Sequence, residues 1–145
     1  MYFVDRDKIE QTLNMIENNI KNIKKQKSWN EPIEKLALER IAHLFIDSIL
    51  DVGNALIDGF IMRDPGSYED IIDILLDEKV VDEKDAQSLK EIVAFRKVLV
   101  QNYLEINHEE LLKALTEHLP SLELYPTKVR TYLENELGPV NAFKS

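Results

Sequence analysis

The sequence contains no cysteine among its 145 residues, and this absence excludes several kinds of chemistry. Disulfide bonds, a catalytic thiolate, and zinc or iron–sulfur centres held by cysteine are all ruled out. No apolar run approaches the ~18 residues that a membrane-spanning helix needs, and Met1–Arg6 lacks the long apolar stretch of a secretion signal. We therefore expect a soluble protein that works in the cytoplasm.

Positive charge is also scarce, because 18 lysines and arginines face 27 aspartates and glutamates, for a net charge of -9. Broad contact with phosphates requires clustered cations, so any contact with RNA must be local. A glycine-rich phosphate loop and a nucleophile elbow are absent too, which disfavours several common enzyme classes. A chain of this length buries roughly 68–70% of its unfolded surface. We expect one domain, residues 1–145, with a full hydrophobic core.

Apolar residues recur at steps of three and four, which predicts an all-α bundle of five or six helices. Asp5 is the expected N-cap of the first helix, and Asn30 is the expected N-cap of a long helix that ends near Phe60. The stripe of the first helix is formed by Ile9, Leu13, Ile16, Ile20 and Ile23. The stripe of the long helix is formed by Leu38, Ile41, Phe45, Ile49, Val52, Leu56 and Phe60.

Shorter helices are expected beyond this pair. One covers residues 69–77, another is capped by Asn107, and a last segment covers residues 121–137. Pro126 lies inside that last segment and is expected to delay its start, because proline lacks the backbone N–H that a helix interior uses. Gly138-Pro139 is expected to stop the helix.

The least ordinary feature lies in a helix expected from Asp82 to about Tyr103. A series at helical spacing shares one face and places a guanidinium within an apolar seam, formed by Leu89, Val93, Arg96, Val100 and Tyr103. We expect this helix to be central and mostly buried. An arginine is always charged, so Arg96 either forms a buried ion pair with a carboxylate of the long helix or lines a cleft that a ligand reaches.

The same helix resembles the motif of the HepT-like proteins, a branch of the HEPN superfamily: an Arg, four residues, a His, any residue and a Tyr. Arg96 and Tyr103 fall on the Arg and the Tyr, whereas Gln101 stands at the His position and Lys97 replaces a common Asn or Asp. The whole chain resembles the family in helix order and length. The resemblance implies a HEPN-type four-helix bundle with additional short helices, paired as a homodimer whose motifs face one cleft.

The resemblance also implies a metal-independent ribonuclease toxin of a toxin–antitoxin pair, with Arg96 and Gln101 at the catalytic positions and no cofactor. In such an enzyme a His moves protons at the phosphodiester while an Arg stabilises the charged transition state. Arg96 keeps the second role, but the amide of Gln101 does not titrate and cannot perform the first. His43 and His108 are the candidates to replace it as proton carrier.

Helical geometry adds a condition, because five residues along an ideal helix correspond to a rotation of about 140°. Gln101 would then point away from Arg96, whereas Tyr103 would share its face. We expect Arg96 and Gln101 to converge only if the helix is distorted or a second subunit completes the cleft.

A partner is implied as well, namely a minimal nucleotidyltransferase antitoxin that transfers AMP to the motif tyrosine, here Tyr103. The added phosphate would lie beside Arg96 and occupy the cation that RNA uses. A second hypothesis of another class stays open. In it the chain is a non-catalytic helical module that binds a nucleotidyltransferase or RNA, and Tyr103 is a contact or modification site.

Two further sets of residues allow alternative interpretations. One face of the long helix carries His43, Asp47, Asp51, Asn54 and Asp58, which form either a solvated or partner-facing surface or a set of metal ligands. We favour the surface and expect no metal. The first helix ends in Lys21, Lys24, Lys25 and Lys27, which either complement the helix dipole or contact an RNA backbone.

Overall fold

A computed structural model describes residues 4–138 of the chain, and every regular element within this range is helical. The elements are α1 (Arg6–Lys25), α2 (Pro32–Gly59), α3 (Tyr68–Asp77), α4 (Glu83–Val93), α5 (Arg96–Val100), the short 3-10 helix η1 (Tyr103–Glu105), α6 (His108–Glu117) and α7 (Leu119–Leu137). The predicted all-α class is confirmed. No helix in the described range is long and apolar enough to cross a membrane.

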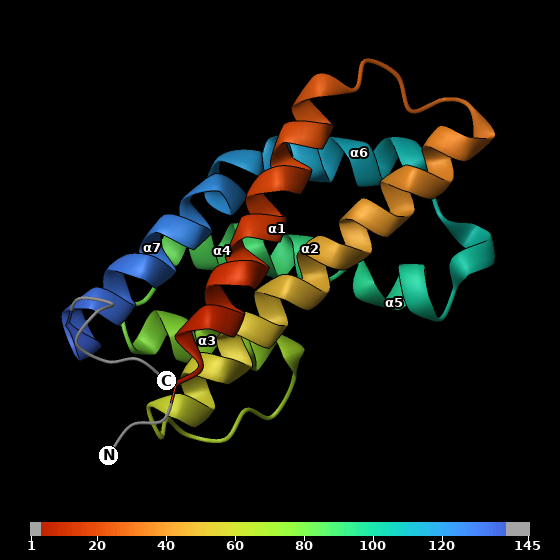
Figure 1. Ribbon diagram of the computed structural model, residues 1–145. Helices are drawn as coiled ribbons and strands as arrows, with labels where there is room; N and C mark the ends of the chain where they lie inside the picture. Colours follow the sequence, from red (N-terminus) through yellow and green to blue (C-terminus); the bar gives the residue numbers. More distant parts are fainter. Residues whose placement is uncertain (1–3, 139–145) are drawn as a thin grey trace.

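The long helices form the body of the molecule. Figure 1 shows α1 and α2 side by side in opposite directions, with α7 next to α1 on the side away from α2. Helices α3 and α4 pack against α2 and against each other, and α6 packs across α2. The short α5 lies at the edge of the bundle, where it contacts α2.

The predicted apolar stripes of α1 and α2 face the core. All five residues of the α1 stripe are buried, and in the α2 stripe only Ile41 remains partly exposed. Helix α7 completes this core through Tyr125, whose ring is fully buried and whose hydroxyl donates a hydrogen bond to the carbonyl of Ile49 at 2.9 Å. Burial raises the pKa of the Tyr125 phenol, because the phenolate would have to lie in an apolar environment.

Helix boundaries agree with most of the predicted caps. Side-chain oxygens accept backbone N–H bonds at the N-caps Asp5, Ser67, Asp82 and Asn107. The prediction of Asn30 as a cap is wrong. Pro32 occupies the first turn of α2 and Glu31 is the cap, in a reciprocal capping box with Glu34. A residue before proline avoids helical geometry, which places the boundary at Glu31.

The expectation for Pro126 is also wrong, since α7 continues through it from Leu119 to Leu137. Residues on both sides of the proline, Leu122 and Val129, are fully buried, and this packing outweighs the loss of one backbone hydrogen bond. The helix is capped by Gly138, whose φ of 82° is a left-handed geometry that suits glycine. The other half of the predicted stop, Pro139, lies outside the described residues.

The predicted continuous helix from Asp82 to Tyr103 is wrong as well. It breaks at Ala94–Phe95 into α4 and α5, and only the α4 half is deeply buried. Phe95 and Leu99 are partly buried against the core, and α5 packs along α2 instead of continuing with α4 across α3 and α7. The break therefore changes the direction of the chain just before Arg96.

Arg63 fixes the loop that leads from α2 into α3. Its guanidinium donates two hydrogen bonds to the carboxylate of Asp70, at 2.7 and 2.8 Å, and the backbone N–H of Gly66 donates a third at 2.8 Å. The hydrogen bonds from Arg63, followed by that from Gly66, lower the pKa of Asp70 from 3.8 to about 2. Asp70 therefore remains ionised and holds the start of α3 in place at neutral pH.

Replacing Arg63 by Gln is expected to raise the pKa of Asp70 toward its ordinary value of 3.8. A carboxyl with a depressed pKa in the folded state stabilises the fold above its unfolded pKa and loses this contribution as the pH falls through its folded pKa. Wild-type protein should thus lose more stability than Arg63→Gln as the pH falls from about 4 to about 2. The ¹³C chemical shift of the Asp70 carboxyl measures the pKa directly. The control is Lys84→Gln, which changes an exposed lysine. Equal titration midpoints of the Asp70 carboxyl in Arg63→Gln and Lys84→Gln would contradict the assignment.

Candidate functional site

An open hollow lies where the start of α3 meets the junction of α4 and α5. Its volume is about 510 Å³, and it is lined by Ser67, Tyr68, Glu69, Val93, Ala94, Arg96, Lys97 and Gln101. Two predicted catalytic residues, Arg96 and Gln101, therefore belong to one concave surface. The hollow depends on the break in the α4–α5 helix, because its residues come from both sides of that break.

Arg96 is half-buried and begins α5. The only interaction of its side chain within the described range is with Tyr68, whose ring centroid lies 4.4 Å from the guanidinium carbon Cζ. The interpretation of Arg96 as a buried ion pair with a carboxylate of α2 is therefore wrong. An aromatic face attracts a guanidinium electrostatically but carries no net charge, so Tyr68 does not neutralise Arg96. Glu69 also lines the hollow but forms no ion pair with Arg96.

Gln101 is the C-cap of α5 and is exposed. Its backbone N–H and that of Asn102 both donate to the carbonyl of Lys97, at 2.8 and 3.1 Å, in the last turn of this short helix. The helix end is distorted here within a single chain, and Gln101 lines the same hollow as Arg96. The side chain of Gln101 can donate or accept a hydrogen bond but cannot carry a proton at neutral pH.

Tyr103 lies in η1, with 63% of its surface exposed. Ordinary core packing does not describe it, and it does not line the hollow that contains Arg96. The prediction that Tyr103 and Arg96 share a helix face is wrong, because α5 ends at Val100 and Tyr103 lies in the next helix, η1. Its exposure leaves the phenol open to an external partner.

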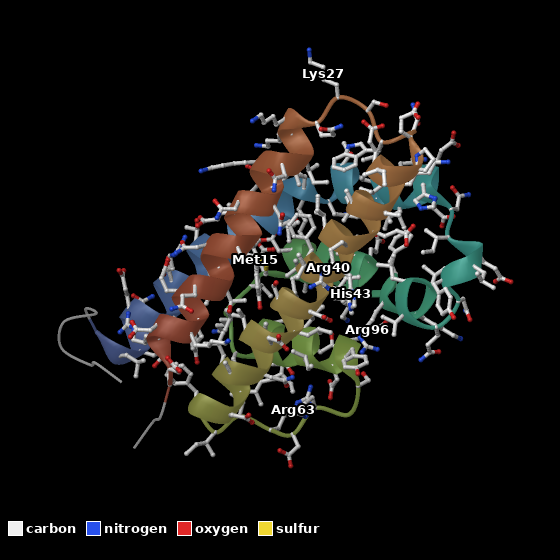
Figure 2. The ribbon with its side chains drawn as sticks, turned by 45° about the vertical axis from the view of Figure 1, so that its right-hand side comes forward. Met15, Lys27, Arg40, His43, Arg63 and Arg96 are labelled. Atoms are coloured by element: carbon white, nitrogen blue, oxygen red, sulfur yellow. The ribbon has the colours of Figure 1, made fainter. Side chains whose placement is uncertain are left out.

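Each candidate proton carrier lies beside a carboxylate. Nε2 of His43 lies 3.1 Å from Asp47 on the same face of α2, and Nε2 of His108 lies 2.7 Å from Glu39, which joins α6 to α2. Neither histidine lines the hollow. Figure 2 shows His43 between Arg40 and Arg96 in that view, and α2 and α5 are in contact. His43 thus lies on the helix that α5 contacts.

The acidic face and the lysine cluster show no specialised geometry. Among the residues that the structure describes, no three His, Asp or Glu side chains are grouped so that they could hold a metal ion. On that face Asp51, Asn54 and Asp58 are exposed. Of the lysines at the end of α1, Lys24 pairs with Glu123 at 3.1 Å and the others are exposed.

Tyr68 was not identified from the sequence, although its ring makes the one cation–π contact of Arg96 in the described range, where the arginine has no hydrogen bond or ion pair. It follows the N-cap Ser67, in a position that sequence patterns assign only to the start of a helix. Its proximity to Arg96 depends on how α3 packs against the end of α4, and no spacing along the chain signals that packing.

Comparisons with known proteins agree with this architecture. The chain is 55% identical over 144 residues to the Bacillus subtilis (strain 168) protein named "Putative RNase YutE", covering 99% of this chain and 100% of the relative. The solved structure of YutE from Bacillus subtilis, described as a cytosolic protein of unknown function, matches with a TM-score of 0.96, 55% identity and coverage of 99% and 100%. A chain from the crystal structure of a toxin–antitoxin with AMP-PNP matches with a TM-score of 0.77 and 17% identity, over 86% of this chain and 98% of that chain, and so shares the fold.

The family assignment rests on the first of these relatives and on a family model. Residues 9–129 match the model described as ribonuclease HepT-like, which covers most of the chain and includes α5 and the hollow. Together, the family model and the relative that is 55% identical show that this protein belongs to the HepT-like ribonuclease family.

Proposed function

We propose that this protein is a metal-independent ribonuclease toxin of a toxin–antitoxin pair, acting in the cytosol, with Arg96 as the residue that stabilises the transition state. The observation that carries the proposal is a half-buried arginine that has no ion pair with a carboxylate in residues 4–138 and lines an open hollow together with Gln101. Membership of the HepT-like family supports ribonuclease chemistry, and the shared fold with a toxin–antitoxin chain supports a toxin.

The chemistry requires no metal. The 2′-hydroxyl oxygen of RNA attacks the adjacent phosphorus, the bond from phosphorus to the 5′-oxygen breaks, and one proton leaves the nucleophile while another reaches the leaving oxygen. Charge accumulates on the non-bridging oxygens, where a guanidinium with free N–H donors stabilises it. Arg96 can supply this stabilisation, and the amide of Gln101 can orient the phosphate by a hydrogen bond.

His43 is the proposed proton carrier in place of the missing motif histidine. It is half-buried on α2, the helix against which α5 packs, and its Nε2 lies 3.1 Å from the carboxylate of Asp47. A carboxylate beside one ring nitrogen helps to orient the imidazole. Substrate would have to extend from the hollow toward α2 for His43 to reach the scissile phosphate.

Cleavage of mixed cellular RNA in the presence of EDTA tests the role of Arg96. Arg96→Ala should lower the rate about 10²–10³-fold, the usual loss when one charge-stabilising donor is removed. Lys113→Ala, which removes an exposed cation of α6, should leave it unchanged. Equal rates in wild type and Arg96→Ala would refute the proposal.

His43→Gln and His108→Gln test the proton carrier, and full activity in both would exclude His43 and His108 from that role.

A specific observation favours a second candidate function. No histidine lines the hollow that contains Arg96, so the local chemistry for proton transfer is incomplete within one described chain. If wild-type protein leaves RNA intact while Arg96→Ala weakens RNA binding, the chain is a non-catalytic binding module. Its partner would then be RNA or a nucleotidyltransferase.

We propose that the active unit is a homodimer formed around the α5–η1 segment. Apolar side chains there are unusually exposed, with Val100 at 38%, Tyr103 at 63% and Leu104 at 91%. A second copy would cover this surface and bring two motifs together.

Light scattering at micromolar concentration should give twice the mass of the chain, and Leu104→Asp should shift the protein toward the monomer. A monomer mass for wild type would overturn the homodimer.

Regulation is proposed at Tyr103, through transfer of AMP by a minimal nucleotidyltransferase antitoxin. The phenol oxygen forms a bond to the α-phosphorus of ATP, the bond to the β-phosphate breaks, pyrophosphate leaves, and the phenolic proton passes to a base of the partner enzyme. The exposure of Tyr103 supports access for such an enzyme. The product carries bulk and a negative phosphate on the exposed α5–η1 segment, where both oppose the approach of RNA.

Incubation with a HepT-type nucleotidyltransferase partner, ATP and Mg²⁺ tests this regulation. Mass spectrometry should show the addition of AMP on a peptide that contains Tyr103, with loss of RNA cleavage or RNA binding. Tyr103→Phe should remain unmodified and insensitive to the partner. Modification of Tyr68 in place of Tyr103, or no modification of wild type, would contradict the assignment.

A further inference from the structure

Tyr68 is an exposed aromatic residue that the chemistry above does not use. It is the first residue of α3, and 50% of its surface is exposed. Its ring lies under the guanidinium of Arg96, with Cζ 4.4 Å from the ring centroid, and both side chains line the hollow that contains Gln101. Core packing does not account for a ring that is half exposed, so its contact with Arg96 is the interaction to explain.

An aromatic partner holds an arginine without neutralising it. A carboxylate would offset the positive charge and would use up N–H donors of the guanidinium. A ring attracts the cation through its face, and the N–H donors at the edge of the planar guanidinium remain available. Arg96 therefore keeps both its charge and its donors for a phosphate, while its long side chain is restrained.

The backbone that carries Tyr68 is itself fixed. The Ser67 hydroxyl accepts the backbone N–H of Asp70 at 3.1 Å, and the carboxylate of Asp70 is held by Arg63 and by the N–H of Gly66. The ring is thus attached to a capped helix start that has its own ion pair. Arg63 forms an ion pair with Asp70, whereas Arg96 stacks on a neutral ring, so the two arginines have different roles.

We propose that Tyr68 is a positioning residue for Arg96. The tyrosine ring holds the guanidinium at the hollow in an orientation that suits a phosphate of RNA. This inference rests on the proposed role of Arg96 in catalysis. Tyr68 acts through the arginine and does not touch the reacting atoms. A different role, stacking of an RNA base on the exposed part of the ring, would act independently of Arg96 and raise KM, and the experiment distinguishes the two.

The kinetic test compares Tyr68→Phe and Tyr68→Leu, each with Arg96 present and in the Arg96→Ala background. Tyr68→Phe keeps the aromatic face and should retain wild-type kcat. Tyr68→Leu should lower kcat about two- to fivefold, the size of an exposed cation–π contact, with little change in KM. In the Arg96→Ala background the same substitution should have no further effect, because residues that act as one unit are not additive. Equal losses in both backgrounds, a rise in KM alone, or unchanged kcat in Tyr68→Leu would overturn the inference.

A second measurement does not depend on activity. The ¹⁵N relaxation of the Arg96 Nε–H group should show a restrained side chain in wild type and Tyr68→Phe, and a mobile one in Tyr68→Leu. If this pattern appears but wild-type protein does not cleave RNA, the proposed ribonuclease function fails and the positioning role stands. A mobile Arg96 in wild type, or equal mobility in wild type and Tyr68→Leu, would overturn the positioning role whatever the cleavage result.

Discussion

Phe95 and Leu99 pack against the core from α5, and α5 follows α2 while α4 packs on α3 and α7. One straight helix cannot satisfy both packings, so the chain turns at Ala94–Phe95. The hollow lies at this junction and is lined by residues from both sides of the turn, with Arg96 and Gln101 both on the α5 side. Apolar burial at the edge of the bundle thereby determines the geometry of the polar motif.

The charges of the protein explain how a strongly acidic chain can present a local site for an anion. Arg63, Lys128 and Arg130 are engaged by carboxylates and join separate elements of the bundle. Arg130, for example, binds Glu10 and Glu17 across α7 and α1, and its hydrogen bonds lower the pKa of Glu17. Arg96 instead stacks on a neutral ring. These three cations hold separate parts of the fold together, whereas the proposed role of Arg96 is to bind an anionic substrate.

Much of the fold could be predicted from the sequence because local rules and global packing agree there. The stripes of α1 and α2 have a strict helical period, and oxygen-bearing side chains at Asp5, Ser67, Asp82 and Asn107 cap the following helices. The errors arise where tertiary packing overrides local preference. Ala94 and Phe95 contain no helix breaker, yet the helix ends there, whereas Pro126 is a breaker and the helix continues.

The site was predictable only in part, for the same reason. The motif identified Arg96, Gln101 and Tyr103 from one short stretch, but the partners of Arg96 depend on which helix packs beside it. Tyr68 comes from another helix, and the exposure of Tyr103 follows from the end of α5 at Val100. Contacts between distant segments leave no regular spacing in a single sequence.

The central claim is that RNA binds in the hollow between α3 and the α4–α5 junction. The most direct measurement is the change in backbone amide chemical shifts when a short RNA with blocked 2′-hydroxyls, which cannot be cleaved, is titrated into wild-type protein. The account predicts that the changes concentrate on residues 67–69, 93–97 and 101. Changes confined to the lysines at the end of α1, or no changes with saturating RNA, would contradict it.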